Sequence, residues 1–217
     1  MTLTIHPAFY YRAKSEEWTD PWQERDYAAR NIIAAVKGKP FKSTSRFTSQ
    51  QNGKVFVLSD TEAGRNFAKN WCALRLSQSV TAAGYTSTLI VPVPSSSHTN
   101  PEADFTGRQL ANAIQAVTPS FVASPSLYFR EAVPKSSAGG GRDQVLLQSK
   151  LEWTGIPAGT RVVLLDDVFT TGAHLKAAAR FLRAKGVRVD DAIVAARTRW
   201  ERPPDMFTTE PETLTFF

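Results

Sequence analysis

The chain has 217 residues, of which 42% are hydrophobic and 21% are charged, and its formal net charge is +6 at pH 7. These proportions are ordinary for a folded protein, and the length suits one α/β domain with an elaborated edge better than two full domains. No apolar stretch is long enough to cross a bilayer, and the single cysteine, Cys72, excludes an internal disulfide and a cysteine-rich zinc site.

The composition also indicates a compartment and a class of ligand. Residues 1–7 lack the basic and apolar segments of a signal peptide, and Cys72 is expected to be a small buried hydrophobe, so we expect a cytoplasmic protein without membrane contact. The positive charge permits an anionic ligand. Its excess is greatest from Lys176 to Arg202, where a solvated helix face is the simpler explanation. Contact with nucleic acid or an acidic protein partner is the alternative.

The first predicted element is a helix in a segment rich in aromatic residues. Asp20-Pro21 predicts its start, with an aspartate cap and a proline at the first position, and the helix is expected to end at Lys37 before a glycine. A strand over 41–47, an Asn52-Gly53 turn and a strand over 54–58 predict a hairpin.

Helices and strands alternate along the rest of the chain. A helix is predicted over 61–82, a strand over 88–94 that ends Val-Pro-Val-Pro before a turn, and a helix over 105–117. A second strand–helix unit is expected to begin near Ser120, with its strand over 126–130. This alternation predicts a mostly parallel sheet flanked by helices, with ligands bound beyond the C-terminal ends of its strands.

Residues 162–174 are the most informative segment, Val-Val-Leu-Leu-Asp-Asp-Val-Phe-Thr-Thr-Gly-Ala-His. Four aliphatic residues indicate a strand buried on both faces, and we expect it to end at Asp166 and Asp167. A small-residue turn then leads into a helix over 173–185. This order places free backbone N–H groups at a helix N-terminus, which binds phosphate. Carboxylates beside such a loop suit a sugar phosphate, because they accept hydrogen bonds from vicinal hydroxyls.

The C-terminal part of the chain is expected to add a strand over 191–197. After Arg202 comes Pro203-Pro204, and then a Thr-rich tail with aromatic residues at its end. We expect this tail to form a late strand or a packed extension.

Residues 162–174 resemble the signature of the type I phosphoribosyltransferases, which bind phosphoribosyl pyrophosphate (PRPP). That pattern is four apolar residues, two acidic, two apolar and Thr-Thr-Gly-x-Thr, and His174 stands where Thr or Ser is usual. The resemblance implies the type I phosphoribosyltransferase fold. It implies that Asp166 and Asp167 contact the ribose hydroxyls. It also implies a loop around the 5′-phosphate, formed by Thr170, Thr171, Gly172, Ala173 and His174. An acidic strand end before a glycine turn in an unrelated doubly wound protein is the alternative.

The chain further resembles the ComF-like subgroup of this family. The resemblance rests on Val-Pro-Val-Pro before a turn, on Arg-Asp-Tyr-x-x-Arg-x-Ile-Ile-x-x-Val-Lys-Gly over 25–38, and on a glutamine-centred stretch before Asp-Asp. In that subgroup the Val-Pro-Val-Pro strand feeds a loop facing the pyrophosphate, which here contains Ser95, Ser96 and Ser97. This loop lacks the basic and glycine-rich residues usual in the subgroup, and a polar surface loop is the alternative.

The family chemistry transfers a ribosyl group from PRPP as pyrophosphate leaves. The resemblance implies Mg²⁺ that bridges the diphosphate and the ribose hydroxyls, held by Asp166 and Asp167 mainly through the substrate. A lid is expected around the glycine run 139–141, with Lys135 and Arg142 as catalytic residues on either side. A plain flexible connection is the alternative for this stretch.

Two functional hypotheses follow from these patterns. In the first, residues 1–50 form a helical hood and residues 51–217 a phosphoribosyltransferase-like core, integrated in one domain of a homodimer. This protein binds PRPP, or a nucleoside monophosphate, with Mg²⁺ and transfers phosphoribose to or from a nucleobase-like acceptor that stacks on the aromatic N-terminal segment. In the second, the protein is a non-catalytic PRPP or nucleotide sensor, or an assembly component of a DNA-uptake or defence system.

Overall fold

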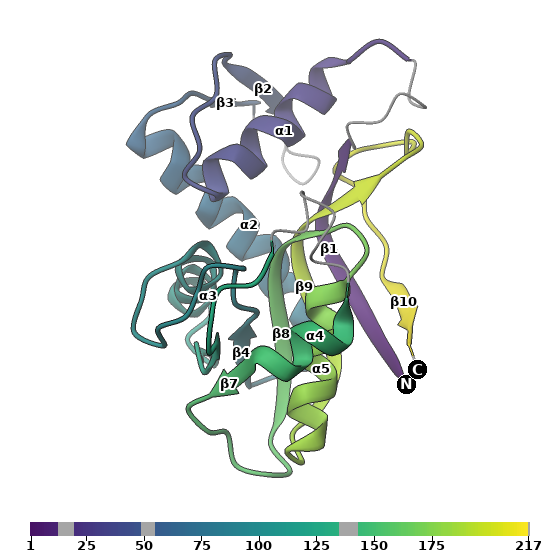
Figure 1. Ribbon diagram of the computed structural model, residues 1–217. Coiled ribbons are helices and arrows are strands. Elements are labelled where there is room, and N and C mark those ends of the chain that lie inside the picture. Colours follow the sequence, from purple (N-terminus) through teal and green to yellow (C-terminus); the bar gives the residue numbers. More distant parts are fainter. Residues whose placement is uncertain (13–19, 49–54, 135–142, 217) are drawn as a thin grey trace.

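The computed structural model describes residues 1–12, 20–48, 55–134 and 143–216. Its main sheet contains β1 (Thr2–Arg12), β4 (Thr88–Pro92), β5 (Phe121–Ala123), β8 (Arg161–Phe169), β9 (Arg188–Arg199) and β10 (Glu212–Thr215). The strand order is β10-β1-β9-β8-β4-β5, and every neighbouring pair is parallel except the antiparallel pair of β10 and β1 (Figure 1). The predicted mostly parallel sheet flanked by helices is therefore confirmed.

Helices cover both faces of this sheet. Those on one face are α1 (Glu24–Val36), α2 (Glu62–Ala82) and α3 (Thr106–Val117), and those on the other are α4 (Gln144–Lys150) and α5 (Ala173–Ala184). The side chains of β8 alternate between two hydrophobic clusters, because Val163 and Leu165 pack with the first group of helices and Val162 and Leu164 with the second. Burial of β8 on both faces is thus confirmed.

Two small antiparallel sheets lie outside the main one. They are formed by β2 (Ser45–Thr48) with β3 (Val55–Leu58) and by β6 (Leu127–Phe129) with β7 (Leu151–Trp153). The predicted hairpin is present in β2 and β3, although β2 begins later than predicted, and its Asn52-Gly53 turn lies outside the described residues. The predicted strand over 126–130 is not part of the main sheet. Pro125, which has no N–H to donate, separates β6 from β5, and β5 takes the place in the sheet.

The N-terminal strand β1 lies between β9 and β10, inside the main sheet. The sequence pattern does not predict this strand, because its proline and its run of aromatic residues obscure any alternation. Its register with β9 extends from the Thr4–Asp191 pair to the Arg12–Arg199 pair. Residues 2–12 therefore belong to the core of the sheet and not to a helical elaboration.

Helix α1 begins at Glu24, after Gln23 as its cap, and not at Pro21 as predicted. The backbone N–H of Gln23 donates to Asp26 Oδ2 at 2.9 Å, and the same carboxylate oxygen lies 3.0 Å from Arg202 Nη2. Because this buried carboxylate fixes the first turn, Asp20 is not needed as a cap. The carbonyl of Asp20 accepts a hydrogen bond from Arg12 instead.

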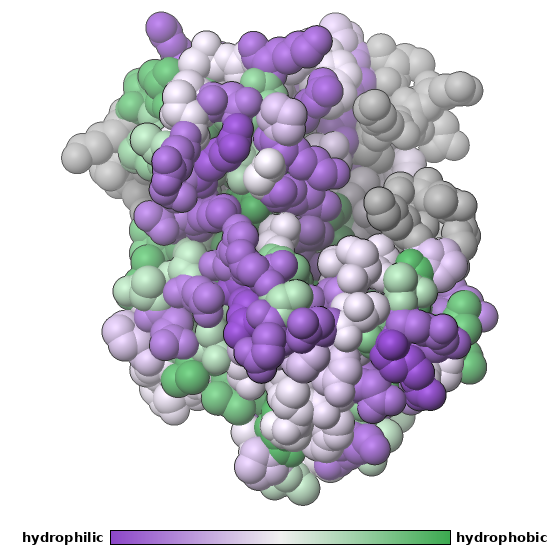
Figure 2. Space-filling model, turned by 60° about the vertical axis from the view of Figure 1, so that its left-hand side comes forward, coloured by the Kyte–Doolittle hydropathy of each residue, from purple (hydrophilic) through white to green (hydrophobic). Residues whose placement is uncertain are grey.

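The other predicted helices agree closely with the structure. Thr61 caps α2, Phe105 precedes α3, and α5 ends beside Lys185. Cys72 is fully buried on α2, as predicted. Within the described residues, no helix combines the length and the apolar character needed to cross a membrane. The face seen in Figure 2 is mainly hydrophilic, with hydrophobic side chains in small separate patches.

Candidate functional site

The segment that follows β4 and the segment that follows β8 lie on opposite faces of the sheet. The chain leaves β4 for α3 on one face and leaves β8 for α5 on the other. The N–H of Val93 donates to Leu165 O at 2.8 Å, and beyond this bond the segments after β4 and along β8 separate. A topological switch point of this kind is where open α/β sheets bind their ligands. Both Asp166 and Asp167 lie immediately beyond it.

The two carboxylates lie within β8 and not at its end, so the predicted strand end was wrong. β9 is longer than predicted and supplies partners for β8 as far as the Phe169–Arg197 pair. Asp166 Oδ1 accepts a hydrogen bond from the N–H of Asp167 at 2.8 Å. Asp167 Oδ2 lies 3.3 Å from Nζ of Lys37, which follows α1. The site therefore combines two strand carboxylates with a cation from the N-terminal part of the chain.

The protonation of Asp166 is set by its surroundings. Burial and the neighbouring Asp167 carboxylate raise the pKa of Asp166 to about 8, while the hydrogen bond from the Asp167 N–H and the charge of Lys37 act in the opposite direction. Asp166 therefore retains its proton at neutral pH until a cation or a hydroxyl-bearing ligand stabilises the ionised form.

The turn after β8 has the geometry of an anion-binding loop. Gly172 caps α5 in the left-handed region, with φ of 74°, and a Cβ at this position would clash with the Phe169 ring. The first hydrogen bond of α5 runs from Lys176 N to Gly172 O at 2.8 Å, and among the described residues no side chain bonds to the N–H groups of Ala173 and His174 before it. These donors, together with the helix dipole, suit a phosphate.

β9 braces this loop from the side. Nη1 of Arg197 donates to the carbonyl oxygens of Thr170 at 3.2 Å and of Thr198 at 2.6 Å. The hydroxyls of Thr170 and Thr198 are 3.0 Å apart. Thr171 is exposed and directs no hydroxyl bond into the fold among the described residues. Its hydroxyl is therefore available to a ligand.

The remaining sequence candidates have different surroundings. The serine turn follows β4 at the same edge of the sheet, with Ser95 and Ser97 exposed and with Ser96 O accepting from Val133 N at 2.8 Å. The ring of His174 is partly buried near Phe129, and this burial lowers the pKa of His174, so the ring adds no positive charge to the loop at neutral pH. The predicted lid residues, Lys135 and Arg142, lie outside the described residues.

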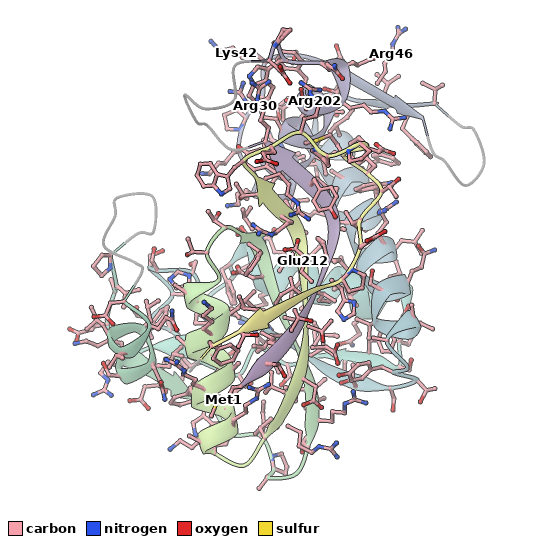
Figure 3. All side chains as sticks on the ribbon, turned by 90° about the vertical axis from the view of Figure 1, so that its right-hand side faces the viewer. Met1, Arg30, Lys42, Arg46, Arg202 and Glu212 are labelled. Carbon is pink, nitrogen blue, oxygen red and sulfur yellow. The ribbon has the colours of Figure 1, made fainter. Side chains whose placement is uncertain are left out.

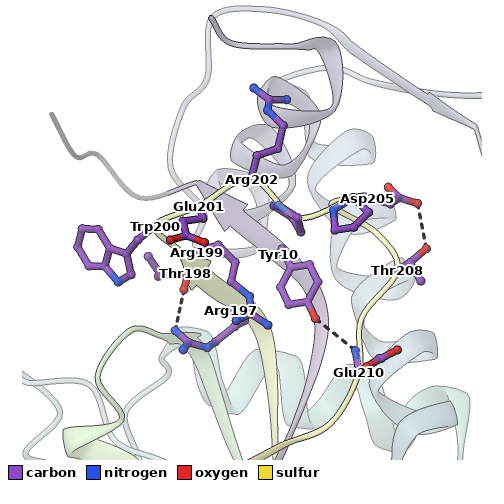
Figure 4. A pocket seen from close by; sticks show the side chains of 12 residues that line it. Tyr10, Arg197, Thr198, Arg199, Trp200, Glu201, Arg202, Asp205, Thr208 and Glu210 are labelled. Atoms are coloured by element: carbon purple, nitrogen blue, oxygen red, sulfur yellow. Dashed lines mark hydrogen bonds between the residues drawn. The ribbon is translucent and has the colours of Figure 1, made fainter. Parts of the chain in front are cut away.

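A cavity of about 830 Å³ lies beside the loop, between the end of β9 and the segment that follows it (Figure 4). Tyr10 of β1, residues 197–205, Thr208 and Glu210 line it, so segments far apart in the sequence form it together. Arg197 and Thr198 line this cavity and also contact Thr170 in the loop between β8 and α5. Trp200 is about half exposed at the cavity. The volume is within the range of small-molecule sites.

Three of the eight basic residues between 176 and 202 are paired with carboxylates of the described residues. Arg197 and Arg199 each lie 3.1 Å from a carboxylate oxygen of Glu212. Arg202 pairs with Asp26 and lies at the same end of the molecule as Arg30, Lys42 and Arg46 (Figure 3). Internal pairing therefore accounts for only part of the basic excess in the C-terminal half.

Sequence patterns do not predict three residues of the site, Lys37, Arg197 and Thr198. Arg197 and Thr198 carry no local motif, because they act through a neighbouring strand. Lys37 ends the 25–38 segment that carries the ComF-like resemblance, and its place beside a helix stop is the signal that could have identified it.

No protein-family model matches the chain, and no curated protein matches it. Solved structures that resemble it include phosphoribosyltransferases. The adenine phosphoribosyltransferase of Saccharomyces cerevisiae, with an imino-altritol bisphosphate and adenine, is 14% identical over 77% of this chain and 89% of that one, with a TM-score of 0.43. The orotate phosphoribosyltransferase of Aeropyrum pernix is 18% identical over 76% and 81%, with a TM-score of 0.39. UMP synthase of Leishmania donovani is 19% identical over 79% of this chain, which spans 31% of that protein, with a TM-score of 0.41.

Proposed function

We propose that this protein is a type I phosphoribosyltransferase that binds PRPP and transfers its phosphoribosyl group to a nucleobase-like acceptor. The observation that carries the proposal is the position of two carboxylates and an uncapped helix N-terminus side by side at the switch point of the sheet. The Val-Pro-Val-Pro strand and the segment ending at Lys37 support the ComF-like subgroup. A cytoplasmic homodimer remains our expectation.

Different residues of the site bind different parts of PRPP. The N–H groups of Ala173 and His174 and the hydroxyl of Thr171 donate to the 5′-phosphate, while Asp166 and Asp167 accept from the ribose hydroxyls. The ring is then fixed with C1 open to attack. An acceptor nitrogen forms a bond to C1 as the C1–O bond breaks, and the electron pair leaves on pyrophosphate. The acceptor nitrogen loses its proton to complete the exchange.

The carboxylates also fit Mg²⁺. This ion prefers oxygen ligands and is commonly bound by one or two carboxylates together with substrate phosphates. Among the described residues no group of three or more His, Cys, Asp and Glu side chains could hold a metal, so Asp166 and Asp167 would hold the ion jointly with oxygen atoms of PRPP. When bound, Mg²⁺ would neutralise charge on the diphosphate.

We place the acceptor in the cavity lined by Tyr10, residues 197–205, Thr208 and Glu210. Its proximity to the phosphate loop supports this placement, because Arg197 and Thr198 line the cavity and also contact Thr170. The arginines that line the cavity are paired with Glu212 and Asp26, which favours an uncharged planar heterocycle over a second anion. The ring of Trp200, which is about half exposed, offers a surface for stacking.

Ligand binding and turnover test this function separately. PRPP with Mg²⁺ is expected to raise the melting temperature, because a ligand that binds only the folded state stabilises it by mass action. With a panel of nucleobases the protein is expected to release pyrophosphate, and Asp166→Asn with Asp167→Asn is expected to abolish both effects. Binding without turnover on any base would support the alternative of a non-catalytic sensor, and no shift at millimolar PRPP would contradict both.

A further inference from the structure

Lys37 extends from the end of α1 to the carboxylates of β8. It is the C-cap of that helix, and its N–H donates to Ile33 O at 3.0 Å. Its ammonium lies 3.3 Å from Asp167 Oδ2, with 27% of the Lys37 side chain and 28% of the Asp167 side chain exposed. Among the described residues, Lys37 is the cationic residue that contacts this pair of carboxylates, and its contact is with Asp167.

Fold stability does not explain why this lysine points at the site. A partly exposed ion pair contributes little to folding, because solvent screens it and ordering a long side chain costs entropy. The charge of a lysine at a helix C-terminus interacts favourably with the helix dipole whichever way its side chain points. Lys39, two residues further along, is exposed and forms no such pair among the described residues. The direction of Lys37 toward Asp167 therefore indicates a role in the site.

Among the described residues, the loop after β4 supplies no positive charge where the diphosphate of PRPP would lie. It contains Ser95, Ser96 and Ser97 and no lysine or arginine before Asn100, and burial lowers the pKa of His98. The carboxylate of Asp167 repels a diphosphate, and serine hydroxyls offer donors without charge. A leaving group with developing negative charge is stabilised best by cations and preorganised donors. The ammonium of Lys37 supplies both a charge and three donors.

We propose that Lys37 donates hydrogen bonds to the diphosphate of PRPP and compensates for the basic residues missing after β4. This inference rests on the proposed function. The chemistry of PRPP supports the geometry, because the carbon that carries the diphosphate is bonded to the carbon that carries the 2-hydroxyl. A cation within contact distance of Asp167, which accepts from the ribose hydroxyls, is therefore within reach of the diphosphate. The flexible lysine stem allows the ammonium to contact both groups.

Calorimetric titration with two ligands tests this role. Ribose 5-phosphate shares the phosphate and the hydroxyls of PRPP but has no diphosphate. With Mg²⁺ present, Lys37→Gln is expected to weaken PRPP binding about 10-fold or more, because it removes a charge-assisted hydrogen bond. Its affinity for ribose 5-phosphate is expected to stay within about twofold. Lys37→Arg is expected to keep most of the PRPP affinity, and the matched control Lys39→Gln all of it.

The other outcomes of the titration contradict the inference in distinct ways. An equal loss for both ligands would mean that Lys37 only positions Asp167. Unchanged PRPP affinity in Lys37→Gln would exclude the contact and leave the proposed function intact. Absence of PRPP binding by the unchanged protein would overturn the proposed function together with this inference. Circular dichroism of each variant verifies that it is folded.

Discussion

Arg197 on β9 donates a hydrogen bond from Nη1 to the carbonyl oxygen of Thr170, at 3.2 Å. The arginine thereby fixes the loop between β8 and α5 from the neighbouring strand. The same guanidinium lies 4.5 Å from the centroid of the Phe169 ring and pairs with Glu212 on β10 at 3.1 Å. One side chain thus connects the loop, the aromatic ring below it and the edge strand. Donors that must meet a phosphate in one geometry need support of this kind.

Arg197→Met is expected to weaken the binding of ribose 5-phosphate about 10-fold, because the loop loses its brace. Unfolding free energy is expected to fall by about 1–3 kcal/mol. Arg183→Met is the matched control, since Arg183 also donates to two backbone carbonyls, of Val189 and Thr2, far from the loop. Urea unfolding and calorimetry together separate the two effects. A similar loss of affinity in both variants would indicate a general loss of stability.

Gly172→Ala is expected to destabilise the protein more than Gly84→Ala. Both glycines have positive φ, of 74° and 87°, so both alanines are strained by about 1–2 kcal/mol. Only at Gly172 would the added Cβ also clash with the Phe169 ring and lie 3.1 Å from Leu214, which adds about 1–3 kcal/mol. The difference in urea midpoints measures this packing term. Equal losses would mean that the loop can move away from the ring.

The raised pKa of Asp166 predicts a pH-dependent stability. The folded state holds this proton while an unfolded chain, whose aspartates titrate at about 3.9, has released it. The contribution of Asp166 to stability is therefore fully present below about pH 4 and is lost as the pH rises through about 8. Asp166→Asn cannot ionise and is expected to be more stable than the unchanged protein at pH 9.

The gain in Asp166→Asn is expected to be about 1 kcal/mol or more at pH 9, which corresponds to about 2–4 °C in melting temperature. It is expected to shrink at pH 5, where the unchanged protein keeps the proton. Differential scanning fluorimetry over this pH range, without ligand, measures the trend. A gain that is the same at both ends would show that Asp166 does not titrate in this window.

Trp200→Ala is expected to raise KM for the acceptor about 10-fold, because stacking of a base on an aromatic ring contributes about 1–3 kcal/mol. KM for PRPP is expected to change little, since the diphosphate and the phosphate lie elsewhere. Trp22→Ala is the informative comparison, because Trp22 belongs to the aromatic N-terminal segment and does not line the cavity. If Trp22→Ala alone raised KM, the acceptor would lie against that segment.

The sequence predicts the centre of the site because its determinants are local. Four aliphatic residues form a strand buried on both faces, and Gly172 adopts the positive φ that a helix cap of this kind requires. The helix from Ala173 follows from its own periodicity. Each of these features depends on residues within one turn or one strand, so a linear pattern is enough to predict it.

The parts that failed depend on distant partners. Asp166 and Asp167 lie within a strand because β9 extends far enough to pair with them, and no pattern near residue 166 specifies that length. Lys37 reaches Asp167 only through the packing of α1 against the sheet. The strand β1 contains Pro7 and is buried by neighbours that lie near the other end of the chain. Such pairings are set by tertiary contacts and not by local propensity.

The position of β1 sets an order of events during synthesis. His6 of β1 bonds to Asp191, 185 positions further along the chain. At about 5–20 residues per second, the ribosome extends the chain for on the order of 10–40 s between these two residues. Through that interval Leu3, Ile5 and Phe9 have no strand to pair with, and the brace from Arg197 does not yet exist. The nascent chain is therefore most vulnerable to aggregation just before its site can form.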